Sequence, residues 1–200
     1  MNIGKVFQDK SWKKTPEFAA FVSAAVYGLL VHSFALNNVL NNYDNIACQP
    51  SGYGTGVSSG RWFLELLGLF FEKAGLSYNL PFVNGFVYIL LLAMAAAVTV
   101  SVLRIRSGVS AALVGCLLVS FPAVTVTMIF RFTAVFYGIS ILFAVLTVWV
   151  LDRFRGSAAV SVVLLALSMG IYQAYVPVTI ALFVLQLICR GLRGEADAKK

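Results

Sequence analysis

A long polar stretch carries one carboxylate and one arginine in a chain that is otherwise rich in hydrocarbon side chains. Residues 41 to 62 read "NNYDNIACQPSGYGTGVSSGRW", with Asp44 near the start and Arg61 near the end. A carboxylate acts as a general acid or base, and a guanidinium binds a phosphate through paired hydrogen bonds. The two side chains are therefore candidates for proton transfer and for anion binding. Arg61 has two simpler alternatives, an ion pair with Glu65 one turn later and a contact with lipid head groups.

Four further side chains have the chemistry to bind a charged or sugar-like ligand. Arg131 stands in "MIFRFTAVFYG", where an arginine among apolar neighbours is costly unless it faces protein, water or phosphate; the alternative is snorkelling to lipid head groups. Tyr172 and Gln173 can exchange hydrogen bonds with sugar hydroxyls, and Trp62 offers a ring for stacking. Each of these three could instead anchor the protein at the membrane interface. His32 could touch the polar stretch, or it could serve helix packing.

The composition places these residues in a membrane protein. Of the 200 residues, 60% are hydrophobic and 12% are charged, and the mean hydropathy is +0.88. These values are typical of a polytopic, all-α membrane protein. The net charge of +7 would suit nucleic acid only if it were gathered on one face of a soluble fold, so we expect no nucleic-acid partner.

Six apolar segments have about the length that crosses a ~30 Å hydrocarbon layer as a helix. The last two are short, and they could form a helical hairpin with its tip at Tyr172 and Gln173 or one long broken helix; Pro177 favours an interruption. The six segments are approximately Glu17 to Leu36, Pro81 to Leu103, Val109 to Ile129, Thr133 to Leu151, Ser157 to Tyr172 and Ala174 to Cys189.

Lysines and arginines are shared unequally between the two sides that six crossings define. Of the 15, all but Arg61, Lys73 and Arg131 fall on the side of the termini. This distribution follows the positive-inside rule, which places both termini in the cytoplasm and the polar stretch outside. Five crossings would strand the basic C-terminal tail on the wrong side, so six crossings and the hairpin are favoured. Residues 1–200 then form a single transmembrane domain.

The connection 37–80 is the outer loop with room for a site. Its first part, 37–58, is rich in Asn, Gly and Ser and has no apolar period, which indicates irregular backbone. Its second part, 59–74, is too short and too charged to cross the bilayer, and we expect an amphipathic helix on the outer membrane surface, capped by Ser58 or Ser59. Its narrow polar stripe consists of Arg61, Glu65, Gly68 and Glu72.

Three short motifs resemble one family of membrane enzymes. They are "NNYDNIAC" after the first apolar segment, "SGRW" at the start of the surface helix and "GIYQAYVP" between the last two segments. Together they resemble the N-terminal part of the membrane glucosyltransferases typified by phage-encoded serotype-converting, O-antigen-modifying enzymes of the GT-C class. The resemblance covers this whole chain but only the front of longer relatives. Relatives often have two adjacent acidic residues where this chain has Asp44 followed by Asn45.

The resemblance implies transfer of a sugar, glucose above all, from a polyprenyl-phosphate carrier to a hydroxyl of a surface glycan such as the O-antigen of lipopolysaccharide. The enzyme would work at the outer face of a bacterial inner membrane. Asp44 would be the catalytic base, because it is the acid in the polar part of the loop. Arg61 and Arg131 would bind the leaving phosphate, and Trp62, Tyr172 and Gln173 the sugar. No cofactor follows from the resemblance, and a metal requirement stays open.

Two other classes compete with an enzyme. A transporter fragment is disfavoured, because the cores of the six segments contain essentially no ionisable residue. A truncated or non-catalytic membrane protein that binds lipid-linked glycans, or assembles with a membrane partner, stays open. Cys48, Cys116 and Cys189 are predicted to lie too far apart for a disulfide or a Cys/His metal site.

Overall fold

The computed structural model describes residues 15–38, 56–76, 80–154 and 156–194, and within these ranges all the regular structure is helical. The all-α membrane fold predicted from the composition is confirmed. Asp44 and Cys48 lie outside the described residues. The elements are α2 (Pro16–Val31), α3 (Ser33–Asn37), η2 (Gly56–Ser59), α5 (Trp62–Lys73), α6 (Pro81–Leu103), α7 (Gly108–Ser120), α8 (Pro122–Ile129), α9 (Arg131–Arg153), α10 (Ala158–Ile171), η3 (Gln173–Tyr175) and α11 (Val176–Leu192).

Every apolar segment predicted from the sequence is helical, although only some are long enough to span a membrane unaided. Three helical stretches in the described ranges have the length and hydropathy of a span, namely α6, α9 and η3 with α11. The pair α7 and α8 adds a fourth if its 43° bend lies within one span, and Pro122 at the start of α8 explains the break. The shorter α2 and α10 are also apolar, so the count of six crossings stays a prediction.

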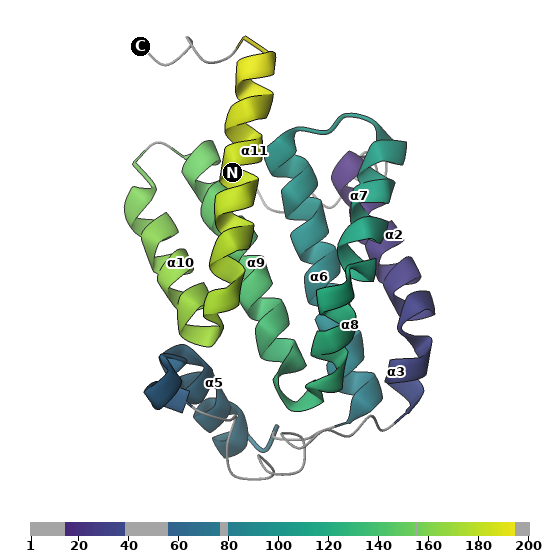
Figure 1. Cartoon of the computed structure of the whole chain (residues 1–200), viewed down its shortest axis with the longest axis vertical. Helices are drawn as coiled ribbons and strands as arrows, with labels where there is room; N and C mark the ends of the chain where they lie inside the picture. Colours follow the sequence, from purple (N-terminus) through teal and green to yellow (C-terminus); the bar gives the residue numbers. More distant parts are fainter. Residues whose placement is uncertain (1–14, 39–55, 77–79, 155, 195–200) are drawn as a thin grey trace, which may run out of the picture.

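Helices α6 and α9 form the centre of the bundle (Figure 1). On one side α2 packs against both α6 and α7, and on the other α10 packs against α9. Small residues permit the close approach of α2 and α7, because a Cβ on Gly115 would lie 2.5 Å from the carbonyl oxygen of Ala20. His32 is buried at the end of α2, with its Nε2 2.8 Å from the carbonyl oxygen of Val119. The histidine therefore serves helix packing.

Most described charges gather at one end of the bundle, where α6, α9 and α11 finish (Figure 1). There Asp152 forms ion pairs with Arg104 at 3.6 Å and Arg190 at 3.3 Å, and Arg193 donates a hydrogen bond to the carbonyl oxygen of Leu103. These arginines are among those assigned to the cytoplasmic side from the sequence. The opposite end carries α5 and the turn between α10 and α11.

The last two apolar segments form the predicted hairpin. Helix α10 ends at Ile171, Tyr172 adopts extended backbone, and the turn η3 leads directly into α11. Pro177 lies in the first turn of α11, where its missing N–H costs no helical hydrogen bond. The hairpin tip therefore presents Tyr172 and Gln173 at the end of the bundle that carries α5 (Figure 1).

Candidate functional site

Helix α5 lies against the tip of the α10–α11 hairpin, and a glycine makes this contact possible. A Cβ on Gly170 would lie 2.7 Å from Cε2 of Trp62 and 2.8 Å from Cβ of Phe63, both too short for a real contact. Further along α5, the ring of Phe71 packs edge-on against Phe136 of α9 with 5.2 Å between centroids. The start of α5 is therefore held at a defined position on the bundle.

The face that α5 turns toward the bundle differs in part from the predicted one. Leu64 and Gly68 are buried, although Gly68 was assigned to a water-facing polar stripe. The opposite face leaves large apolar side chains exposed, as expected of a helix at a membrane surface: Trp62, Leu66, Leu69 and Phe70. The polar stripe thus lies at the border between the buried and the exposed face.

The start of α5 is also built differently from the prediction. The helix begins at Trp62 and its N-cap is Arg61, so neither Ser58 nor Ser59 is the N-cap residue that the sequence predicted. Gly60 just before it has a φ of +76°, a conformation that glycine adopts without strain. A Cβ there would meet Nε2 of Gln173 at 2.6 Å. That nitrogen donates a 3.0 Å hydrogen bond to the carbonyl oxygen of Ser59, which ties the loop to the hairpin tip.

Arg61 points at aromatic side chains of the bundle. Its Cζ lies 5.0 Å from the centre of the Tyr172 ring, and its Nη1 donates a 3.4 Å hydrogen bond to the hydroxyl of Tyr137. Within the described residues it makes no ion pair with Glu65. The cation–π contact restrains the guanidinium plane without using its N–H donors. Arg61 is thus a half-buried, oriented cation. An arginine of this kind can bind a phosphate group through two parallel N–H···O hydrogen bonds, that is, in a bidentate manner.

Three tyrosines support this arginine, and we name them with it the Arg61 cluster: Arg61, Tyr137, Tyr172 and Tyr175. The Tyr137 and Tyr172 rings stack with 4.6 Å between centroids, and Tyr175 meets them edge-on at 6.3 Å and 5.3 Å, respectively. Tyr137 comes from α9, and the other two tyrosines flank the hairpin tip. The cluster thus joins α5, α9 and the hairpin in one place.

Arg131 occupies a separate position at the same end of the bundle. It is the first residue of α9 and is only 4% exposed, which favours contact with protein over snorkelling to lipid head groups. Asn84 in the first turn of α6 donates a 2.9 Å hydrogen bond to the Arg131 carbonyl oxygen, which joins the starts of the two central helices. Six residues separate Arg131 from Tyr137, a rise of roughly 9 Å along α9.

The structure brings together four of the side chains singled out from the sequence, namely Arg61, Trp62, Tyr172 and Gln173. Tyr137 and Tyr175 were missed. Tyr175 stands three residues after Tyr172 in "GIYQAYVP", and a search for tyrosines near the hairpin tip would have found it. Tyr137 lies within an apolar helix and carries no comparable signal. Cys116 and Cys189 are free thiols.

Comparison with known protein families gives one match across most of the chain. A family model described as "Glucosyl transferase GtrII" matches residues 33–200. The chain belongs to this family. Comparisons with curated proteins and with solved structures find no match. The region that matches the GtrII family starts at α3 and includes α5, α9 and the hairpin, so every residue of the Arg61 cluster lies within it.

Proposed function

We propose that this member of the GtrII family transfers glucose from a polyprenyl-phosphate carrier to a hydroxyl of a surface glycan, such as the O-antigen of lipopolysaccharide. The observation that carries the proposal is the position of Arg61, half-buried and held on Tyr172 and Tyr137 at the end of the bundle where α5 lies at its surface. An oriented guanidinium at the end of the bundle, beside the surface helix α5, suits the phosphate of a lipid-linked sugar. Membership of a glucosyltransferase family supports the same reaction.

The reaction is a displacement at the anomeric carbon of the donor sugar. The acceptor oxygen forms a bond to this carbon, and the bond from the carbon to the phosphate oxygen breaks with its electron pair leaving on the phosphate. Asp44 accepts the proton of the acceptor hydroxyl. Arg61 binds the phosphate that leaves, with Arg131 as a second cation. A single displacement with one base inverts the anomeric centre.

The sugar is the ligand we assign to the polar and aromatic side chains beside Arg61. Trp62 offers an exposed ring for stacking, and Gln173 can accept a hydrogen bond from a sugar hydroxyl through its amide oxygen while its nitrogen donates to Ser59. We further propose a GT-C architecture in a bacterial inner membrane, with both termini cytoplasmic and α5 on the outer surface. The partners would be the lipid-linked donor, the glycan acceptor and membrane lipids; assembly with a further membrane protein belongs to the alternative of a non-catalytic protein.

The test is a transfer assay in membranes that contain the full chain, supplied with polyprenyl-phosphate glucose and the glycan acceptor. Asp44→Asn removes the base and should lower the rate by about 100-fold or more, the usual contribution of general base catalysis. Glu72→Gln is the matched control, because it makes the same change on an exposed residue of α5. Arg61→Gln should raise the KM for the donor, whereas Lys73→Gln at the other end of α5 should leave it unchanged.

Two results would refute the proposal. Transfer that is unaffected by Asp44→Asn removes this carboxylate from the mechanism. Absence of transfer by the wild-type chain, while the chain still binds the lipid-linked glucose, favours the alternative of a non-catalytic protein that binds lipid-linked glycans.

A further inference from the structure

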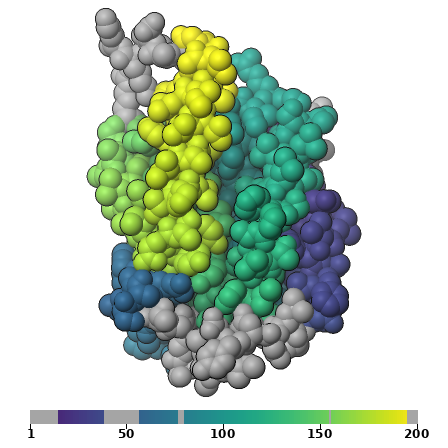
Figure 2. All heavy atoms as spheres, in the orientation of Figure 1, coloured from purple at the N-terminus to yellow at the C-terminus, as the bar shows by residue number. Residues whose placement is uncertain are grey.

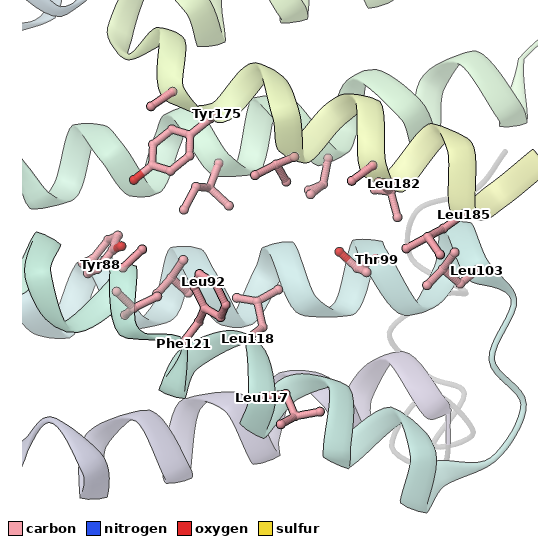
Figure 3. A pocket seen from close by; sticks show the side chains of 17 residues that line it. Tyr88, Leu92, Thr99, Leu103, Leu117, Leu118, Phe121, Tyr175, Leu182 and Leu185 are labelled. Carbon is pink, nitrogen blue, oxygen red and sulfur yellow. The ribbon is translucent and has the colours of Figure 1, made fainter.

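Two cavities of the described residues differ in their chemistry. An apolar furrow of about 550 Å³ lies between α11 and the bent pair α7–α8, where Figure 2 shows a hollow. It extends from Tyr88 and Tyr175 at one end to Leu103 and Leu185 at the other (Figure 3), and its lining has almost no polar atoms. The second cavity, of about 450 Å³, is polar and lies at the end of the bundle that we assign to the cytoplasm. Its volume is usual for a small-molecule site, and its lining suits a charged ligand.

Three arginines line the polar cavity. Arg104 and Arg106 come directly after α6, and Arg153 is the last residue of α9. Asp152 also lines the cavity, but it is shared by Arg104 at 3.6 Å and by Arg190 of α11 at 3.3 Å, so its charge is already balanced. Arg106 and Arg153 are exposed and form no ion pair in the described ranges. The cavity therefore keeps an excess of positive charge, which favours an anionic ligand.

The backbone at Arg104 indicates that the arginine is there for its side chain. Arg104 is the C-cap of α6 and has a φ of +53°, and among the described residues it is the one non-glycine with a positive φ. Helices often end in this conformation with a glycine, because a side chain is strained there. The turn is closed by hydrogen bonds from the N–H groups of residues 104 and 105 to the carbonyl oxygens of Ser101 and Val100, at 3.2 Å and 3.1 Å. Glycine would close the same turn without strain, so the turn does not explain an arginine.

One wall of the polar cavity is aromatic, which is typical of the level where a membrane meets water. Trp149 lines the cavity, and its indole N–H donates a 3.3 Å hydrogen bond to the Ser101 hydroxyl. Its ring also meets the ring of Phe154 edge-on, with 5.7 Å between centroids, and Phe154 is 53% exposed. Aromatic rings gather beside the head groups, and arginines near helix ends reach the head groups themselves. A phospholipid of the cytoplasmic leaflet would therefore have its phosphate at the level of this cavity.

We propose that the polar cavity binds the head group of an anionic phospholipid from the cytoplasmic leaflet, with the phosphate on Arg104, Arg106 and Arg153. The phosphate oxygens accept charge-assisted hydrogen bonds from the guanidinium groups. Glu17 in the first turn of α2 also lines the cavity, and its carboxylate accepts hydrogen bonds from the glycerol hydroxyls of a phosphatidylglycerol head group. The anionic lipids of that leaflet supply the ligand. The site lies at the opposite end of the bundle from the Arg61 cluster, so the inference does not depend on the sugar-transfer reaction.

The experiment titrates the purified full chain in non-ionic detergent with dihexanoyl phosphatidylglycerol and measures bound lipid by native mass spectrometry. Arg106→Gln and Arg153→Gln should each raise the Kd about three- to fivefold, the upper part of the range for exposed charge pairs, and the double variant about tenfold or more. Arg193→Gln is the matched control, because it removes the same charge from an exposed residue that lies at the same end of the bundle and does not line the cavity. Its Kd should stay within about twofold of wild type, since salt screens a charge that does not contact the ligand.

Arg104→Gly separates loss of binding from loss of folding. Glycine adopts a φ of +53° without strain, and Asp152 keeps its ion pair with Arg190, so the melting temperature of this variant should stay close to that of the wild type. Its Kd for phosphatidylglycerol should still rise about three- to fivefold. Binding as tight as that of the wild type would overturn the assignment of the phosphate to Arg104.

Other ligands identify the source of the phosphate. Dihexanoyl phosphatidylethanolamine carries the same phosphodiester with an ammonium group that cancels its charge, and it should bind at least about threefold more weakly. Glycerophosphate and inorganic phosphate are free anions without acyl chains, and they should compete poorly. Equal binding of phosphatidylethanolamine, or displacement of phosphatidylglycerol by an equimolar amount of glycerophosphate, would overturn the inference. An effect of Arg193→Gln as large as that of Arg106→Gln would also overturn it, because the positive charge would then act without a defined site.

Discussion

Substitution of Gly170 by alanine should displace α5 and with it Arg61. The new Cβ would lie 2.7–2.8 Å from the Trp62 ring and from Cβ of Phe63, whereas ordinary contacts start at 3.4 Å. Helix α5 must therefore move by roughly 0.7 Å or more, because the neighbouring atoms are close-packed. Overpacking of this kind costs about 1–3 kcal/mol, which lowers the ratio of docked to displaced α5 at least about fivefold.

The displacement should reduce catalysis, because Arg61 precedes α5 directly and its contact with Tyr172 depends on the position of that helix. We expect kcat/KM for sugar transfer to fall between about fivefold and 100-fold, since shifts near 1 Å of positioning groups have effects of that size. The assay is transfer from polyprenyl-phosphate glucose in membranes. The environment of Trp62 is followed by its fluorescence emission maximum, measured in protein that also carries Trp12→Phe and Trp149→Phe so that Trp62 is the remaining tryptophan.

Gly191→Ala provides the matched control. Gly191 is also helical, but a Cβ there would meet no atom within 4 Å. Both substitutions raise helix propensity by up to about 1 kcal/mol, so this gain cancels in the comparison. If Gly170→Ala and Gly191→Ala give the same transfer rate and the same Trp62 emission, α5 does not depend on the contact at Gly170 and the reasoning is refuted.

Three further substitutions test other contacts. Tyr172→Ala removes the ring under Arg61 and should raise the donor KM about 2- to 30-fold, whereas Tyr172→Phe keeps the ring and should have little effect; equal effects would contradict the cation–π contact. Ser140→Ala removes the hydrogen bond that the Ser140 hydroxyl on α9 donates to the Ser168 carbonyl oxygen on α10, and it should lower the unfolding free energy by about 0.6–1.7 kcal/mol, measured by denaturation in micelles. Asp152→Asn should lower thermal stability by about 1 kcal/mol and leave transfer unchanged, because its arginine partners lie partly exposed at the opposite end of the bundle; loss of transfer would contradict that separation.

The helical segments and the hairpin could be predicted because their signals are local in the sequence. A run of apolar residues between charged connections marks a membrane helix whatever surrounds it. Tyr172 and Gln173 are polar residues between two such runs, and Pro177 follows them in a position that starts a helix. The start of α5 was not predictable in the same way. The conformation before it depends on a contact between Gly60 and the side chain of Gln173, which lie 113 positions apart in the sequence.

The amino-acid sequence by itself determined that this is an all-helical membrane protein, where its helices lie along the chain, and that Arg61 follows a polar stretch. Only the tertiary structure decided that Arg61 is held on Tyr172 and Tyr137, that Gly68 is buried, and that a furrow ends at Tyr175. The reason is that lipid-facing and protein-facing side chains of a membrane helix are equally apolar, so periodicity does not reveal which face is buried. The rotation and crossing of the helices, set by close packing at glycines such as Gly170, make that choice.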